Sequence, residues 1–128
     1  MKKIISIFVC LLLAICFCSC AKQNDSVFVS IEVKDGVKLA ESFLNLEKDT
    51  STAQLITTFL QYKNIDIQIS DGMIVSIDNT ENSDSEGWLF YINGELAQVG
   101  VNDYIPQKDD KLEIKYLSYS VAFPEFYS

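Results

Sequence analysis

Cysteine is the residue of this chain with the widest chemistry, and all four cysteines lie at positions 10, 16, 18 and 20. Thiols can form disulfides, bind zinc or act as nucleophiles. These four, however, lie inside or just after an apolar run, residues 4–18, that follows Lys2 and Lys3. A positive start, an apolar stretch shorter than the about 20 residues of a membrane span, and a small residue before a cut are typical of an export signal. We therefore expect residues 1–19 to be a cleaved signal peptide outside the fold.

The end of this predicted signal resembles the lipobox of bacterial lipoproteins. In the segment Phe17-Cys18-Ser19-Cys20, the small Ser19 precedes the cysteine that would become the lipidated first residue. Phe17 and Cys18 depart mildly from the commonest pattern. The resemblance implies acyl chains, palmitate among them, on Cys20, a tether over residues 20–26, and a protein that faces outward from the bacterial cell membrane. The alternative is an ordinary secreted protein with a cysteine-rich signal.

Few residues of the mature chain can act as a general base, a nucleophile or a transition-metal ligand. The sequence holds ten lysines, 18 acidic residues and neither arginine nor histidine, for a net charge of −8. Without histidine or a free thiol, the usual catalytic groups are missing, and we expect a protein that is not an enzyme. Carboxylate-only hydrolysis is the one catalytic alternative, and no pair of acids is placed for it. The excess of acidic over basic residues also argues against nucleic-acid binding, which needs a positively charged surface.

An aromatic stretch, residues 87–94, is the most informative part of the mature chain. Apolar side chains occupy both alternating sets of positions: Trp88, Phe90 and Ile92 in one, Leu89 and Tyr91 in the other. Such alternation ending in Asn93-Gly94 predicts a strand that enters a two-residue hairpin. A strand that is apolar on both faces needs cover on both sides. We therefore expect it centrally in a sheet, with a helix on one face and a ligand, a partner or another element on the other.

The other elements must position this strand. Alternating apolar residues predict strands over residues 27–33, 65–70, 73–77, 95–99 and 111–117, with turns at Asp35-Gly36 and Asp71-Gly72. Ser51 and Gln54 fit a capping box at the start of the one convincing helix, which should end near Lys63. Residues 37–47 keep no single period, so that a second strand and a helical turn at residues 39–44 both stay open.

Two segments carry no regular pattern. Residues 79–86 are acidic and contain no apolar residue, so we expect a solvated loop; its acids lack the spacing and central glycine of a calcium-binding loop. Residues 119–127 are aromatic, and they either cover the sheet or form an exposed patch for a partner. We expect the covering role.

The motifs together resemble the transcobalamin-like C-terminal domain family, which is similar to the small β-rich domain of the vitamin B12 carriers transcobalamin and intrinsic factor. They are the Gly87-Trp88 opening, the strand ending in Asn93-Gly94, Tyr104 in the next loop, and the turn and strand of residues 109–116. Asp109 replaces the usual glycine, in a turn conformation that aspartate tolerates. The resemblance implies an α+β domain over residues 27–128, with a β-grasp-like curved mixed sheet and one packed helix.

The resemblance also implies a non-catalytic binding module. In the vitamin carriers the corresponding domain covers one side of the corrin ring, so cobalamin or another corrinoid is the candidate ligand, although no cofactor is required. Trp88, Tyr91, Asn93 and Tyr104 are the candidate ligand contacts, and no metal ligand is expected. From the residues alone, Trp88 also suits a core and Asn93 a turn with positive φ.

The alternative function is a cell-surface protein-protein interaction or structural module without a small-molecule ligand. Such a module would use an exposed sheet edge or the aromatic tail to bind larger surface or transport proteins.

Overall fold

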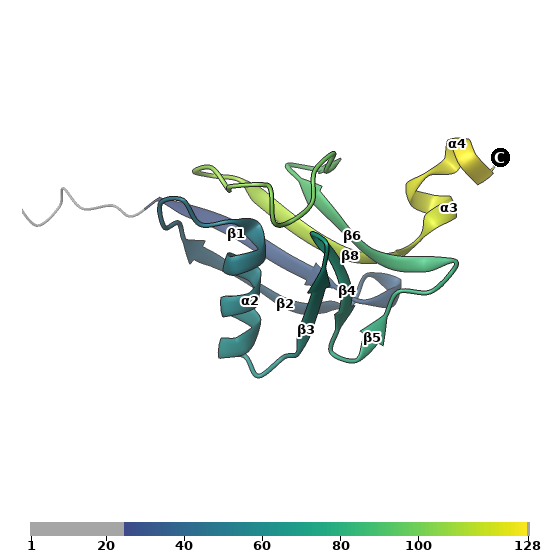
Figure 1. Cartoon of the computed structure of the whole chain (residues 1–128), viewed down its shortest axis with the longest axis horizontal. Helices are drawn as coiled ribbons and strands as arrows, with labels where there is room; N and C mark the ends of the chain where they lie inside the picture. The colour runs from purple at the N-terminus through teal and green to yellow at the C-terminus, as the bar shows by residue number, and fades with distance from the viewer. Residues whose placement is uncertain (1–24, 128) are drawn as a thin grey trace, which may run out of the picture.

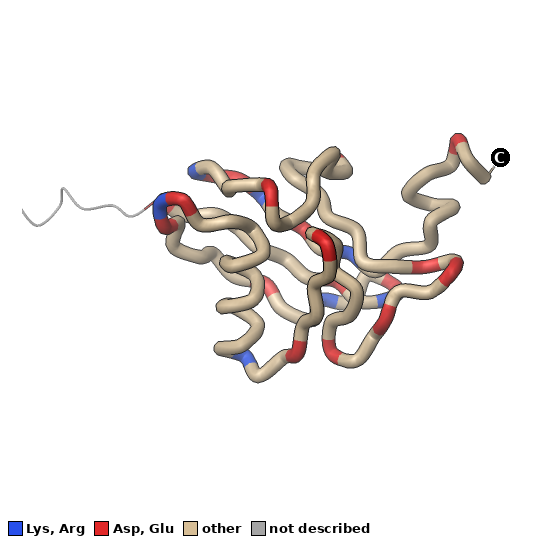
Figure 2. The backbone as a smooth tube through the Cα atoms, viewed as in Figure 1, with Lys and Arg blue, Asp and Glu red and all other residues tan. Residues whose placement is uncertain are grey.

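The computed structural model describes residues 25–127, which form two sheets and one main helix (Figure 1). The predicted signal peptide, Cys20 and most of the predicted tether lie outside the described residues. The predicted α+β class is confirmed. Acidic residues are spread over loops and turns on many sides of the molecule, with few lysines between them (Figure 2).

The larger sheet has five strands in the order β2-β1-β8-β6-β7. Its strands are β1 (Ser26–Glu32), β2 (Lys38–Asn45), β6 (Glu86–Ile92), β7 (Glu95–Leu96) and β8 (Lys111–Ser118). β1 and β8 are parallel, whereas the other neighbours are antiparallel. A short 3-10 helix, η1 (Lys34–Gly36), joins β1 to β2. Of the two alternatives for residues 37–47, a second strand and a helical turn, the structure therefore has the strand.

The smaller sheet follows the order β3-β4-β5. Its strands are β3 (Ile67–Ser70), β4 (Met73–Ile77) and β5 (Thr80–Glu81). The predicted hairpin at Asp71-Gly72 is confirmed. The expected plain loop over residues 79–86 is wrong in part, because β5 pairs with the end of β4.

The main helix, α2 (Thr52–Tyr62), begins as its sequence predicts. The Ser51 hydroxyl accepts a hydrogen bond from the Gln54 N–H at 3.2 Å, and the Gln54 side chain accepts one from the Ser51 N–H at 3.0 Å. The helix and the β3-β4 hairpin lie across one face of the larger sheet (Figure 1). Buried side chains of α2, such as Ile56 and Leu60, form a single core with the inward residues of β1 and β8.

The aromatic strand β6 differs from its predicted central position. β8 lies at the middle of the sheet, and β6 has β8 on one side and only the two-residue β7 on the other. The hairpin at Asn93-Gly94 forms as predicted, but the returning strand ends at Leu96 instead of Val99. Before Tyr91 this edge of β6 has no strand partner, and its backbone groups bond instead to Ser83, to the Asn82 side chain and to the Ala97 N–H.

The aromatic tail forms two short helices, α3 (Tyr119–Ala122) and α4 (Pro124–Tyr127). Its covering role was predicted wrongly for Val121, Phe126 and Tyr127, whose exposed fractions are 68%, 79% and 58%. The first turn is anchored, because the Tyr119 N–H donates to the Ser85 carbonyl at 2.9 Å. A Cβ at Gly87 would collide with the Tyr119 hydroxyl, so glycine at this position allows the anchor.

Candidate ligand-binding site

A groove of about 270 Å³ runs beside β6. It lies between that strand, the loop of residues 96–101, the β3-β4 turn and Phe123 of the tail. One end is closed by a tight backbone contact, in which the Val101 N–H donates to the Gly72 carbonyl at 3.0 Å. A Cβ at Gly100 would stand 2.7 Å from that carbonyl oxygen, so this approach requires glycine.

The walls of the groove are mainly apolar. Its lining includes Ile74, Trp88, Phe90, Leu96, Val99 and Val101. Met73 and Val99, with exposed fractions of 63% and 48%, form part of its rim. Ligand pockets for small molecules typically enclose about 300–1,000 Å³ and combine apolar walls with a few polar groups. The groove is slightly smaller than this range, and its lining is mainly apolar.

Trp88 contributes to this groove from the core. Its side chain is 5% exposed, its Nε1–H donates to the Thr80 carbonyl at 2.8 Å, and its ring meets that of Tyr116 edge-to-face at 5.1 Å. The indole N–H thus already donates a hydrogen bond inside the protein. Trp88 offers a ligand an apolar wall but no hydrogen bond.

Tyr91 lies on the other face of the same strand. It pairs with Glu113 across the β6-β8 ladder, and the Lys115 ammonium lies 5.3 Å from the centre of its ring. Successive strand residues point to opposite faces, so Trp88 and Tyr91 cannot line one site from the same side. The structure therefore separates two of the four predicted contacts.

Asn93 and Tyr104, the other two predicted contacts, meet at a buried carboxylate. Asp110 accepts hydrogen bonds from Asn93 Nδ2 at 2.9 Å, from the Tyr104 hydroxyl at 2.6 Å and from the Gln107 N–H at 2.8 Å. Asn93 Oδ1 also accepts from the Lys111 N–H at 2.9 Å. We call Asn93, Tyr104 and Asp110 the carboxylate latch. It ties the β6-β7 hairpin to the loop before β8.

The hydrogen bonds and burial of the carboxylate latch change the pKa values of Asp110 and Tyr104. Burial would raise the pKa of Asp110, but hydrogen bonds from Tyr104, Gln107 and Asn93 favour the carboxylate, and the net pKa is lowered. Burial, and then the hydrogen bond and negative charge of Asp110, raise the pKa of Tyr104 to about 12. Asn93 has a φ of 52°, as expected for this turn, and its amide is occupied inside the protein.

Two residues of the site were missed by sequence reasoning. Asp110 was part of a charged turn, and the only signal was its place before the final strand of the family pattern. Asn82 lay in the acidic loop, yet its Oδ1 accepts from the Trp88 N–H at 2.8 Å and its Nδ2 donates to the Ile74 carbonyl at 3.0 Å. It joins the two sheets behind the groove, and no local sequence signal indicates this role.

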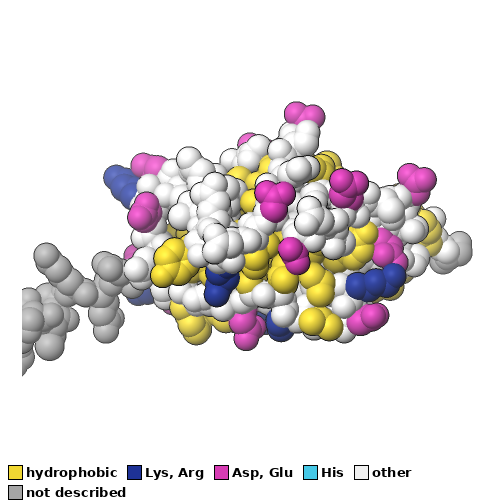
Figure 3. All heavy atoms as spheres, turned by 90° about the horizontal axis from the view of Figure 1, so that it is seen from below, with side chains coloured by type: hydrophobic (Ala, Val, Ile, Leu, Met, Phe, Trp, Pro, Cys, Tyr) yellow, Lys and Arg dark blue, Asp and Glu magenta, His cyan; other side chains and the backbone are white. Residues whose placement is uncertain are grey.

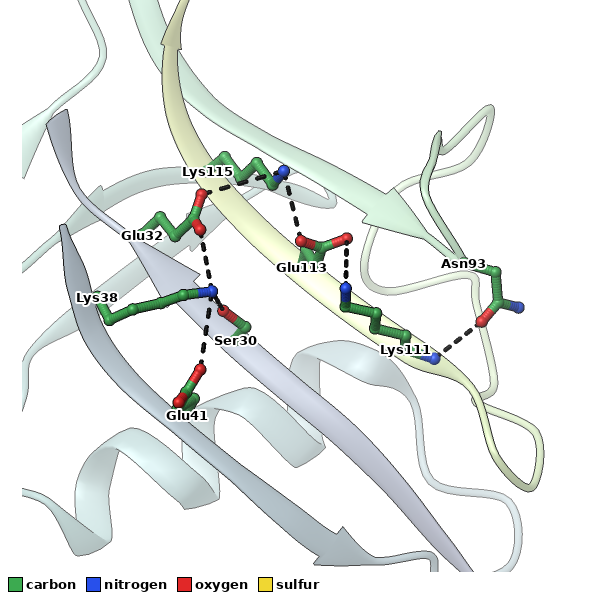
Figure 4. A network of polar contacts seen from close by, with 8 residues as sticks. All are labelled: Ser30, Glu32, Lys38, Glu41, Asn93, Lys111, Glu113 and Lys115. Carbon is green, nitrogen blue, oxygen red and sulfur yellow. Dashed lines mark hydrogen bonds and ion pairs between the residues drawn. The ribbon is translucent and has the colours of Figure 1, made fainter. Parts of the chain in front are cut away.

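The outer face of the larger sheet carries a network of charges (Figure 4). Lys38 Nζ contacts Glu32 at 2.9 Å, Ser30 at 2.7 Å and Glu41 at 3.7 Å, and Lys115 joins Glu32 to Glu113. Lys111 also contacts Glu113 at 3.9 Å, so that three lysines balance the charge of three glutamates in this network.

Residues 25–127 hold no cluster of three or more His, Cys, Asp or Glu side chains placed to bind a metal ion. No helix within the described part of the chain is long and apolar enough to cross a membrane.

Comparison with known proteins agrees with the sequence resemblance. A family model described as Domain of unknown function (DUF4430) matches residues 49–118. The solved structure of haptocorrin in complex with Cbi superposes with a TM-score of 0.60 at 12% identity, over 75% of this chain and 25% of haptocorrin. This chain thus corresponds to about a quarter of that protein. The shared fold is that of a transcobalamin-like domain.

A second structural neighbour is a protein from Ruminococcus gnavus ATCC 29149 that is described as a candidate metal binding protein. It superposes with a TM-score of 0.50 at 15% identity, over 73% of this chain and 97% of its own. Comparison with curated protein sequences finds no match.

Proposed function

The chain belongs to the DUF4430 family, and from its fold and groove we propose that it is a lipid-anchored, outward-facing binding module for a flat, largely apolar ligand of the corrinoid class. The observation that carries the proposal is the apolar groove beside β6, within a fold shared with haptocorrin, which was solved with Cbi, cobinamide. In this proposal the chain binds and does not catalyse, and its sheet and helix form a β-grasp-type scaffold.

The groove supports one-sided binding. Its volume of about 270 Å³ is below the usual range of enclosed ligand pockets, and its walls are open to solvent at Met73 and Val99. Trp88 and Phe90 would contact the flat face of the ligand, while Tyr91 lies on the opposite face of the strand. The carboxylate latch would hold the hairpin at the mouth of the groove, so Asn93 and Tyr104 would act by positioning.

The arrangement of the chain suits a tether at the N-terminus. The first described residues and the C-terminal helices lie at opposite ends of the long axis (Figure 1). If acyl chains on Cys20 hold the N-terminal end at a membrane, α3 and α4 lie far from it. The full sequence has a net charge of −8, and removal of residues 1–19 with Lys2 and Lys3 would leave −10, which would also keep the domain off an anionic lipid surface.

Equilibrium dialysis of the chain against cobinamide and cobalamin tests this proposal. We expect saturable binding that Val99→Gln weakens about fivefold to tenfold, since a polar amide replaces apolar contact at the rim. Val37→Gln is the matched control, because Val37 is also an exposed valine but does not line the groove. No saturable binding of either corrinoid up to high micromolar concentration would contradict the proposal.

A further inference from the structure

The edge strand β2 offers a row of backbone groups without a strand partner. Among the described residues β2 pairs only with β1, and it forms one edge of the larger sheet over eight residues. The Leu46 N–H donates to the Asp25 carbonyl, which fixes the alternation of the antiparallel ladder. The backbone groups of Ala40, Ser42 and Leu44 therefore point to β1, and those of Glu41, Phe43 and Asn45 point outward.

Within the described residues, the part of this edge from Ala40 to Asn45 has little of the usual protection against strand addition, and the one register shift of its ladder, between Ile31 and Glu32, lies at the start of β2. Proteins protect such edges with proline, with outward lysines, with very short strands or with a covering element. β2 contains no proline, and its single lysine, Lys38, is held over the sheet face by Glu32 and Ser30. Near the middle of the edge, the Phe43 side chain is 73% exposed, and its ring lies 5.1 Å from that of Phe28 in a tilted arrangement.

A second groove runs alongside this edge, between β2 and α2. It has a volume of about 440 Å³, and its apolar lining comes from Leu44, Leu55, Phe59 and Tyr62. Tyr62 is 89% exposed at the end of α2. Figure 3 views the molecule from the side where α2 ends, and hydrophobic side chains form a band across the middle of that face. A strand added to β2 would direct every second side chain toward this groove.

Charge decides which strand fits. Glu47 is the only charged residue that lines the groove, and the whole chain has a net charge of −8. Glu41 stands on the edge with its side chain on the opposite face, 3.7 Å from the Lys38 ammonium. A second copy of the chain would bring like charges together, whereas a basic segment would be attracted.

We propose that the β2 edge and the β2-α2 groove bind an extended, basic segment of a partner protein by strand addition. Alternate aliphatic residues of the segment enter the groove, and the lysines or arginines between them point to the opposite face of the sheet, on the side of Glu41. This site is separate from the groove beside β6, so the proposal does not depend on corrinoid binding.

The test uses fluorescent synthetic octapeptides in which lysine alternates with valine, leucine or isoleucine, titrated into the full chain. At least one peptide should bind saturably with a micromolar Kd, and binding should slow hydrogen exchange at the Phe43 and Asn45 amides. The matching peptides with glutamate in place of lysine should bind at least tenfold more weakly. Two further sets carry N-methyl groups either on the lysines or on the aliphatic residues, and the set in which the methylated N–H groups face β2 should lose binding.

Two variants separate the edge from the groove. Phe43→Pro removes an outward N–H from an edge strand, where proline is tolerated, and should weaken binding at least tenfold. Tyr62→Ala should weaken it about threefold to tenfold, while Tyr127→Ala, an exposed tyrosine of the tail, should leave it unchanged. Circular dichroism confirms that each variant is folded.

Three results would overturn the proposal. They are no saturable binding by any lysine peptide up to millimolar concentration, equal binding by both N-methylated sets, and self-association of the chain through β2 in sedimentation experiments. Because the corrinoid assay uses a different surface, its outcome is independent of this one.

Discussion

Asp110 is the residue with the most partners in the candidate site, and its role follows from its burial. It is 7% exposed and accepts three hydrogen bonds, from two side chains and one backbone N–H. A buried carboxylate is tolerated only when it is satisfied in this way. The latch therefore stabilises the conformation of the loop between β7 and β8 rather than offering a free acid to a ligand.

We expect this carboxylate to contribute to stability in a defined pH range. Its folded pKa is lowered, so its contribution is present above the unfolded pKa of about 4 and is lost as pH falls through the folded value. Asp110→Asn should cost about 1–3 kcal/mol of unfolding free energy at pH 7, and the difference should narrow below pH 4. Urea unfolding of the wild type and of Asp110→Asn between pH 7 and pH 2.5 measures this difference in unfolding free energy.

Asp109→Asn is the matched control for this substitution. Asp109 is exposed, and asparagine accepts its φ of 65°, so we expect a change of less than about 0.5 kcal/mol. A pH-independent difference between wild type and Asp110→Asn would contradict the role of the charged form.

Tyr104 gives a prediction at the other end of the pH scale. Its folded pKa of about 12 lies above the usual value of 10.0, so its contribution to stability is full below pH 10 and is lost as pH rises through about 12. Ultraviolet titration should show one tyrosine that ionises near pH 12. Tyr104→Phe should remove this transition, and Tyr62→Phe, at an 89% exposed position, should not.

At the scale of elements, Asn82 connects β6 to β4. Asn82→Ala removes two hydrogen bonds to backbone groups and should lower the unfolding free energy by about 2 kcal/mol. Trp88 is the only tryptophan, so its emission should shift to longer wavelength as the contact between the sheets loosens. Asn102→Ala, at an exposed position, is the control, and equal effects of the two substitutions would contradict the bridging role.

The elements that could be predicted from the sequence are those with local signals. The capping box of Ser51 and Gln54 begins the helix, and the turns at Asp71-Gly72 and Asn93-Gly94 form the hairpins. These patterns work because each is a hydrogen-bonding arrangement between residues close in the chain. All eight non-glycine residues with positive φ in residues 25–127 are aspartate or asparagine, which agrees with the turn preference of these residues.

The features that could not be predicted depend on contacts between distant residues. Asn93 and Asp110 are 17 residues apart, and periodicity gives no sign that their side chains meet. The apolar character of both faces of β6 was correctly recognised, but it could not tell a central strand from one beside a short edge strand. The exposed tail was misjudged for the same reason, since aromatic residues suit a core and a binding surface alike.

At the scale of the whole molecule, the N-terminal anchor is still a prediction. In a bacterial host, Cys20→Ser should move the protein from the membrane fraction to the soluble fraction and abolish labelling with a radioactive or clickable palmitate. The acyl chains supply the binding free energy, about 0.8 kcal/mol per buried methylene, so their loss should release the protein.

Cys18→Ser is the matched control, because it changes a cysteine two residues away and keeps Ser19-Cys20. It should leave the protein in the membrane fraction. Retention of Cys20→Ser in that fraction, still labelled, would contradict lipidation at this residue.

The parallel ladder between β1 and β8 has a consequence for how the chain is made. It joins Phe28 to Lys111, so the middle of the larger sheet cannot form until nearly the whole sequence has been synthesised. Before that point the nascent chain holds only hairpins and a helix, which do not close a core on their own. If the chain is exported as proposed, it would therefore stay unfolded while it passes through the secretion channel and would close its core only after its final strand had crossed.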